Sequence, residues 1–186
     1  MIKRFTEYIN SLLSEKKSDT YEYGCAMVYF DFPQAPELHA MIEPDDLYTE
    51  TGDRTFGIED EPHTTILFGL HSNEIPDEEV IKICTSMPIG QLTLKNASLF
   101  KNSQKGYEVL KFDVENPVLY DINRKLAELP HTTDFPDYHP HCTIAYLKKG
   151  TGDRYVSLLQ GKTFDVTPSE IVYSKPDGSK KRKAWN

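Results

Sequence analysis

The pentapeptide Pro-His-x-Thr-Ile occurs twice in the chain, at residues 62–66 and at residues 140–144. Each copy leads into an apolar stretch that is typical of a buried β-strand. Alternate side chains of a strand share one face, so each copy presents an imidazole and a hydroxyl about 7 Å apart. A strand repeated for structural reasons needs only its apolar residues. The repeated histidine and threonine therefore indicate a shared chemical site.

Two imidazoles and two hydroxyls in one pocket suit the cleavage of a phosphodiester. This reaction deprotonates an attacking oxygen and protonates a leaving oxygen, and two histidines can do both near neutral pH. We predict that His63 and His141 are the catalytic base and acid, in an order that the sequence does not determine. Thr65 and Thr143 are predicted to donate hydrogen bonds to the phosphate oxygens as charge develops.

A third sequence of the same type shows how weak a lone motif is. His131-Thr132-Thr133 also places a threonine two residues after a histidine, but the DFP that follows has no strand pattern. A lone His-x-Thr/Ser arises by chance about once in a chain of this composition, and we interpret this one as a loop coincidence.

The sequence has no motif for a resident metal or cofactor, and we expect neither. It contains no H-E-x-x-H, no C-x-x-C and no carboxylate–histidine cluster at ligand spacing. His139 and His141 are two residues apart, but Pro140 separates them and no second cluster accompanies them. We interpret His139 as a loop or rim residue that is a candidate for contact with the ligand.

Helical and strand patterns follow one another along the chain. The expected helices are residues 2–15, 76–87, 116–129 and 152–161. The expected strands are residues 21–32, 63–70, 91–100, 107–115, 141–149, 163–174 (broken at Pro168) and 180–186. Residues 33–61 are expected to form a long loop with one helical turn, and the acidic run at 43–61 is expected to be solvated.

Strict alternation assigns the side chains of the two motif strands to faces. In the first strand we expect His63, Thr65 and Leu67 opposite Thr64, Ile66, Phe68 and Leu70. In the second we expect His141, Thr143, Ala145 and Leu147 opposite Cys142, Ile144 and Tyr146. The bulkier apolar face is expected to pack under helices, and the other face to line the site.

Each motif begins a segment of strand, helix and strand, so the fold is predicted to have approximate two-fold symmetry. Strands and helices mix without strict alternation, which favours the α+β class. We predict a bilobal fold in which mainly antiparallel sheets form a central cleft and helices pack outside. We expect a single domain, 1–186, with an N-terminal helix at 1–17, the acidic insert at 33–61 and a basic tail at 179–186.

The paired His-x-Thr strands resemble the 2H phosphoesterase superfamily, which is named for two such motifs on a pseudo-symmetric bilobal α+β fold. That family includes 2′,3′-cyclic phosphodiesterases, 2′-5′ RNA ligases and phosphodiesterases acting on RNA ends. The resemblance covers residues 21–174. It implies metal-independent attack at phosphorus, by water on a 2′,3′-cyclic phosphate or by a ribose 2′-hydroxyl on a 3′–5′ linkage. The context YHPHCTIAYL also resembles phage-encoded members that degrade cyclic oligonucleotide signals of the bacterial CBASS defence.

Charge and composition narrow the partners. The net charge is −8, with acid concentrated in residues 43–61 and base in residues 179–183. Long nucleic acid is not expected, because its phosphates need a basic track, whereas a small cyclic nucleotide or a 2′,3′-cyclic-phosphate ribonucleotide needs only a few groups. No apolar run reaches the ~18–20 residues of a membrane helix. The N-terminus has no secretory pattern, and three widely spaced cysteines favour a cytoplasmic location, the host cytoplasm if the chain is phage-encoded.

Three further residues have both a structural and a functional interpretation. Trp185, beside the basic run KKRK, is either a hydrophobic anchor for the last strand or a platform that stacks on a base. Tyr23 either packs within its strand or lines the pocket. Arg54 is either a solvated loop residue or a phosphate clamp.

Two alternative functions stay open from sequence alone. One is an RNA-end-processing or 2′-5′ RNA ligase-like enzyme, which a local basic groove would permit despite the acidic net charge. The other is a module that binds and sequesters nucleotides without turnover. Both His-x-Thr motifs are intact, which argues for catalysis.

Overall fold

The structure, a computed structural model, describes residues 21–53, 55–135 and 137–185, so the expected helix at 1–17 and Arg54 lie outside the described residues. The strands are β1 (Tyr23–Asp31), β2 (His63–His71), β3 (Leu92–Lys101), β4 (Tyr107–Glu115), β5 (His141–Lys148), β6 (Phe164–Ser174) and β7 (Lys180–Ala184). The helices are α2 (Ala35–Ala40), the short 3-10 helix η1 (Pro44–Asp46), α3 (Asp77–Cys84), α4 (Pro117–Leu126) and α5 (Asp153–Leu159). No helix in these ranges is long and apolar enough to cross a membrane.

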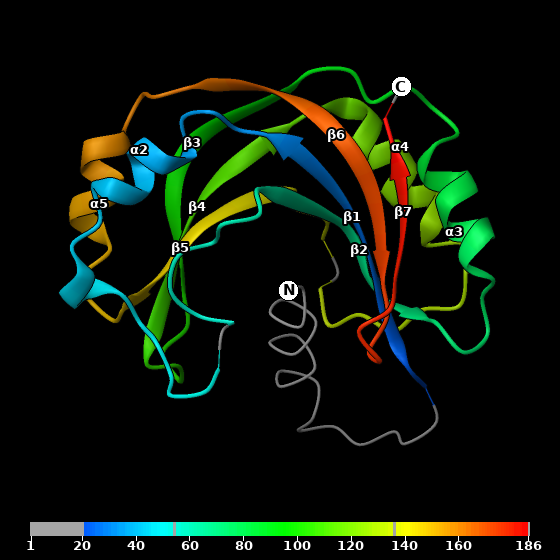
Figure 1. Ribbon diagram of the computed structural model, residues 1–186, viewed down its shortest axis with the longest axis horizontal. Helices are drawn as coiled ribbons and strands as arrows, with labels where there is room; N and C mark the ends of the chain where they lie inside the picture. The colour runs from blue at the N-terminus through cyan, green and yellow to red at the C-terminus, as the bar shows by residue number, and fades with distance from the viewer. Residues whose placement is uncertain (1–20, 54, 136, 186) are drawn as a thin grey trace.

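The strands form one antiparallel sheet in the order β2-β1-β6-β3-β4-β5, with β7 paired to β6. Strand β6 joins two halves, because residues 167–174 pair with β1 and residues 164–166 pair with β3. Figure 1 shows the result as an arch, with β6 across its top. The expected break at Pro168 is wrong: β6 continues through it with only a local irregularity in its pairing with β1. The predicted α+β class with mainly antiparallel sheet is confirmed.

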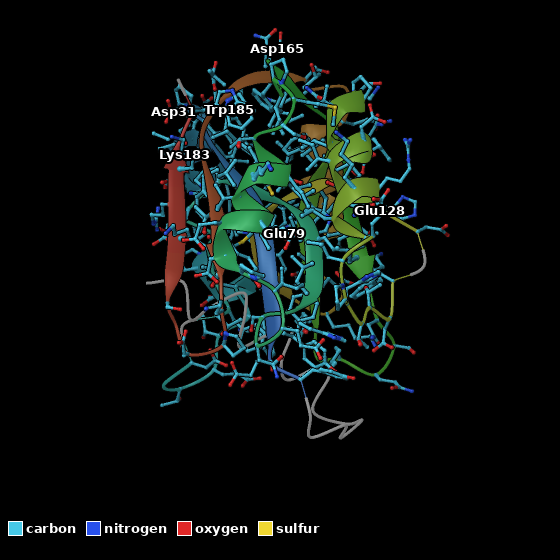
Figure 2. The ribbon with its side chains drawn as sticks, turned by 90° about the vertical axis from the view of Figure 1, so that its right-hand side faces the viewer. Asp31, Glu79, Glu128, Asp165, Lys183 and Trp185 are labelled. Carbon is cyan, nitrogen blue, oxygen red and sulfur yellow. The ribbon has the colours of Figure 1, made fainter. Side chains whose placement is uncertain are left out.

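Helices cover the outer face of the sheet, and the main hydrophobic core lies between these helices and the strands. Figure 2 shows α3 and α4 in front of the strands of one half, while α2 and α5 lie beside the other half in Figure 1. Helix α4 is capped by Asn116, whose side chain accepts a 2.8 Å hydrogen bond from the backbone N–H of Val118. Its buried stripe is Leu119, Ile122 and Leu126.

The opposite, inner face of the sheet carries two smaller apolar clusters, one in each half. The first consists of Tyr23, Cys25, Met27, Tyr29, Phe68 and Val172. The second consists of Tyr48, Phe56, Tyr107, Val109 and Tyr146. These inner clusters flank the two His-x-Thr motifs.

The same β-bulge follows both motifs. Thr65 pairs with Met27 and Leu67 with Ala26, so Ile66 has no partner in the register. Thr143 pairs with Lys111 and Ala145 with Leu110, so Ile144 is unpartnered in the same way. An extra residue reverses the alternation beyond it. The expected faces of Ile66, Leu70 and Ile144 are therefore confirmed, whereas those of Leu67, Phe68, Ala145, Tyr146 and Leu147 are wrong. Phe68 and Tyr146 join the inner clusters, whereas Leu67, Ala145 and Leu147 belong to the main core.

The two motif strands end the sheet path, and each has its outer edge covered by a loop. The acidic insert pairs with β5: the N–H of Tyr48 donates to the carbonyl of Tyr146, and the N–H of Tyr146 donates to that of Gly57, at 2.9 and 2.8 Å. The loop before β5 pairs with β2, where the N–H of Thr132 donates to the carbonyl of Gly69 at 2.9 Å. Covered edges are protected from pairing with another chain.

Gly69 allows this loop to lie on β2, and its replacement tests the contact. Its φ is +92°, and a Cβ there would lie 1.8 Å from the carbonyl oxygen of Thr132. We expect Gly69→Ala to lower the free energy of unfolding by roughly 3 kcal/mol or more, since both the backbone conformation and the loop contact are lost. Gly161→Ala is the matched control, because Gly161 has a φ of +76° with nothing near its Cβ position. It should cost only about 1–2 kcal/mol. Equal losses in urea unfolding of the two variants would contradict the proposed role of Gly69.

Candidate active site

Strands β2 and β5 contact each other where the two halves of the arch meet. The thiol of Cys142 on β5 interacts with the backbone of His63 on β2. The two imidazoles are close enough for His63 to affect the pKa of His141. The structure therefore brings both His-x-Thr motifs into one site. The catalytic roles of these residues stay predictions.

Both histidines are held in the same way. The Nδ1 atom of His63 lies 2.7 Å from the carbonyl oxygen of Glu61, and that of His141 lies 2.8 Å from the carbonyl oxygen of His139. A carbonyl oxygen only accepts, so Nδ1 carries the proton in each ring and Nε2 is the acceptor of the neutral form. Each carbonyl precedes a proline, and a residue before proline is restricted to extended backbone. The repeated proline thus contributes to the orientation of the imidazole.

The repeated isoleucine has a structural role at the bulge. Ile66 and Ile144 are both 1% exposed and pack in the main core. The carbonyl that each bulge leaves outside the ladder has a partner. Asn123 Nδ2 on α4 donates to the carbonyl of Ile66 at 2.7 Å, and the N–H of Glu59 donates to that of Ile144 at 3.0 Å. These contacts fix the point where each strand changes face, directly after the threonine.

His63 lies among aromatic and acidic neighbours. It is 7% exposed, and its ring stacks on that of Tyr29 with centroids 5.2 Å apart. The carboxyl group of Glu59 is buried, and burial raises its pKa while the nearby His63 lowers it. Burial also raises the pKa of Tyr29. Glu59 corrects one expectation, since this residue of the acidic run is buried beside the site rather than solvated.

His141 has different neighbours. The ring of Phe100 on β3 meets it edge-on at 4.8 Å, and the Nζ of Lys111 lies 4.9 Å from the centre of that Phe100 ring. Lys111 forms an ion pair with Asp113, which is paired with His141 in the register of β4 and β5. Burial lowers the pKa of His141 to about 4, and Lys111 lowers it further than Asp113 raises it. His141 is therefore a neutral imidazole at neutral pH.

The two threonine hydroxyls lie beside their histidines. Thr65 is half-buried, with its Oγ1 3.9 Å from the Sγ of Cys25. Thr143 is buried and lies opposite Lys111 in the register. Burial raises the pKa of Cys25 to about 12, so this thiol is neutral near the hydroxyl of Thr65.

A cleft of about 560 Å³ opens beside these residues. Its wall includes Thr65, His141 and Thr143, together with Phe100, Tyr107 and Tyr146. The loop between α4 and β5 supplies the facing wall, and its Tyr138 hydroxyl donates to the carbonyl of Thr65 at 3.0 Å. His63 is not among the described residues that line the cleft. This volume suits a ligand of nucleotide size.

The other candidate residues are distributed around the fold. His139 is exposed and lines the cleft. Tyr23 lies in the inner cluster of its half, with its ring 6.3 Å from Phe68 and 6.1 Å from His71. Trp185 is half-buried against the main core beyond β7 (Figure 2), away from the inner clusters. Its base-stacking role stays a prediction, as does the contact of Tyr23 with the ligand.

Several residues around the site escaped the sequence reasoning. Lys111 interrupts the apolar strand YEVLKFDVE. A lysine inside such an apolar run is the sequence feature that indicates a residue of the site. Phe100 ends the expected strand at 91–100, and Asn123 is a polar residue within a helix that the sequence marks only by its apolar stripe. Glu59 had no signal, because nothing distinguishes it from its acidic neighbours. Among the described residues, no three His, Cys, Asp or Glu side chains gather in a way that would hold a metal ion.

Two facing His-x-Thr strands on an arched antiparallel sheet define the class: the chain has the 2H phosphoesterase fold. Kluyveromyces marxianus Usb1 superposes with a TM-score of 0.56 at 7% identity, covering 88% of this chain and 98% of Usb1. A second Usb1 structure, with uridine monophosphate, has a TM-score of 0.56 at 8% identity over the same shares. Escherichia coli LigT complexed with 3′-AMP has a TM-score of 0.50 at 13% identity, covering 89% and 97%.

At such low sequence identities, the structural similarity establishes the fold alone. No protein-family model matches the sequence, and no curated protein does. The fold implied by the sequence resemblance is thus confirmed by structure, while activity and substrate rest on the chemistry of the site.

The low pKa of His141 predicts a pH-dependent loss of stability. A histidine in an unfolded chain has a pKa of about 6.5. Between that value and about 4, the unfolded chain binds a proton that the folded protein does not, so stability falls as pH falls. We expect His141→Gln to lose less stability than the wild type between pH 7 and pH 4.5, by on the order of 2 kcal/mol.

Urea unfolding at both pH values measures this difference. His139→Gln, which replaces an exposed histidine of the same segment, is the matched control. A wild type and a His141→Gln variant that lose equal stability would show that His141 protonates as readily in the folded protein as in the unfolded chain.

Proposed function

We propose that the protein is a phosphodiesterase that cleaves ribonucleotide phosphodiesters by acid–base catalysis with His63 and His141. The observation that carries this proposal is the matched anchoring of the two rings on facing strands, Nδ1 to a backbone carbonyl in both. This leaves Nε2 as the atom of each ring that can exchange a proton with substrate. Two histidines held in this way are the groups that an attacking and a leaving oxygen require.

The proposed reaction needs no resident metal or cofactor. One imidazole accepts the proton of the attacking water or 2′-hydroxyl, and the other donates a proton to the leaving oxygen. The hydroxyls of Thr65 and Thr143 donate to the non-bridging oxygens as negative charge develops on the phosphate. His139, on the wall of the cleft, is a proposed contact for the nucleoside, and so are Tyr23, Trp185 and Arg54.

We propose a small substrate, either a ribonucleotide 2′,3′-cyclic phosphate or a 3′–5′ cyclic oligonucleotide signal. A cleft of about 560 Å³ and a net charge of −8 favour a small ligand over long nucleic acid. The uridine monophosphate on Usb1 and the 3′-AMP on LigT are ligands of this size. Degradation of a cyclic signal would suit a phage protein that counters CBASS.

Removal of either histidine should abolish turnover but not binding. We expect His63→Ala and His141→Ala to lower kcat by at least about 100-fold, since each loses one proton transfer. The affinity for a nucleoside monophosphate, measured by calorimetry, should change by less than about threefold. The His39→Ala variant is the control, because His39 lies on α2 and is not among the described residues that line the cleft. Wild-type rates in either motif variant would refute the assignment.

The substrate is identified by product analysis. We expect wild-type protein, incubated with chelator, to open some member of a panel of cyclic mono-, di- and trinucleotides and 2′,3′-cyclic-ended RNA, with products read by mass spectrometry. Turnover of the RNA alone would favour the RNA-end-processing alternative. Tight binding without turnover would favour a sequestering module, and loss of activity with chelator would indicate a metal enzyme.

The threonine hydroxyls should act mainly on the transition state. We expect Thr65→Val and Thr143→Val each to lower kcat by roughly 10–100-fold with little change in KM, since the hydroxyl is removed while the shape is nearly kept. Thr64→Val is the control, because this neighbouring threonine is fully buried on the other face of the strand. A KM effect without a kcat effect would reassign the hydroxyls to ground-state binding.

A further inference from the structure

The two halves of the site differ at the residues directly across the strand from each motif. In the first half, Thr65 lies opposite Met27 and His63 opposite Tyr29. In the second half, the equivalent positions are Lys111 opposite Thr143 and Asp113 opposite His141. Because opposite residues of an antiparallel pair share a face, all four neighbours lie on the face of the motifs. The site is therefore symmetric in its histidines and threonines but not in its charge.

Lys111 is unusual for a lysine of an acidic protein. It is 8% exposed and forms an ion pair with Asp113, and it lies over the ring of Phe100, which contacts the His141 ring. Lysine is rarely buried to this degree, because its ammonium loses hydration. Its counterpart Met27 shows that an uncharged residue fits at this register position. Packing alone therefore does not account for a cation here.

We propose that Lys111 is a positioning residue that makes His141 the proton acceptor of the reaction and leaves His63 as the proton donor. This inference rests on the proposed function and deepens it. The Lys111 ammonium disfavours the imidazolium of His141, whereas the buried carboxyl group of Glu59 lies near His63. A general base must start neutral and a general acid must start charged.

The groups that face His141 are few. Lys111 and Asp113 approach from β4 and His63 from β2, Phe100 of β3 is uncharged, and His139 contributes its backbone carbonyl. Of the charged side chains, Lys111 has the largest effect. The opposing charge of Asp113 is weaker and half-exposed, with 43% of its side chain accessible. Burial, the largest cause, and the charge of Lys111 therefore together keep His141 unprotonated.

The reaction then has a defined direction. On a 3′–5′ linkage, the 2′-oxygen forms a bond to phosphorus and its proton passes to Nε2 of His141. The bond from phosphorus to the 5′-oxygen breaks, and this oxygen takes the proton of the His63 imidazolium. The products are a 2′,3′-cyclic phosphate and a free 5′-hydroxyl, so atoms and charge balance.

An activated leaving group distinguishes the two roles. Nitrophenolate leaves without a proton, so a uridine 3′-(4-nitrophenyl phosphate) needs a base but no acid. We expect His63→Ala to lose at least about 100-fold on the dinucleotide UpA but less than about 10-fold on the nitrophenyl ester. His141→Ala should lose at least about 100-fold on both. The reverse pattern would overturn the assignment.

A titration by NMR tests Lys111 without relying on activity. The imidazole resonance that is missing in His141→Gln identifies His141, and we expect its midpoint to rise by about one pH unit in Lys111→Met. Lys111→Arg, which keeps the charge, should leave the midpoint near the wild-type value. Lys181→Met removes an exposed lysine paired with Glu78 on the outer face and is the matched control. An unchanged midpoint in Lys111→Met would overturn the role of Lys111.

The activity assays and the NMR titration test different parts of the proposal, so one can fail without the other. In an active enzyme, the acid limb of kcat/KM should move to higher pH in Lys111→Met by the same amount as the NMR midpoint. A folded wild type that cleaves neither of these substrates nor any member of the cyclic-nucleotide panel contradicts the proposed function and the acid–base roles that depend on it. The NMR titration still decides in that case whether Lys111 controls the charge of His141.

Discussion

The hydrogen bond from a histidine Nδ1 to the backbone carbonyl two residues earlier is the interaction on which the site depends. It fixes the ring plane and the tautomer together, because a carbonyl can only accept. It needs extended backbone at the residue that supplies the carbonyl, two positions before the histidine, and the intervening proline restricts that residue to this conformation. It also needs a strand that starts at the histidine, and both β2 and β5 begin there. The repeated pentapeptide thus contains the residues that are needed locally to present one imidazole and one hydroxyl.

The position of the motif strands at the two ends of the sheet path creates a second requirement. An edge strand has unsatisfied backbone groups, and a bulge adds one more. Here the groups that cover the edges also shape the site. The insert that pairs with β5 brings Glu59 to His63, and the loop on β2 forms a wall of the cleft. Protection of the edges and construction of the site are therefore achieved by the same segments.

Much of this arrangement was predictable from residue patterns, and the rest was not for physical reasons. Apolar periodicity located the strands and helices, and the strand that follows each true motif separated them from the loop pair at His131. Alternation failed for residues 67–68 and 145–147, because a bulge depends on partners distant in the chain, such as Asn123 for Ile66. Glu59 was read as solvated, because burial of one carboxylate in an acidic run is decided by tertiary pairing alone.

Two identical motifs do not by themselves determine which histidine is the proton donor and which is the acceptor. If both rings had the same surroundings, they would titrate together. In the singly protonated pair, the proton would then lie on either histidine with equal probability. The neighbouring strands remove this degeneracy, since Met27 and Tyr29 in one half correspond to Lys111 and Asp113 in the other. The histidines retain the shared geometry while their neighbours differ in charge. In the proposed reaction, the direction of proton transfer is determined by residues one strand away from the two motifs.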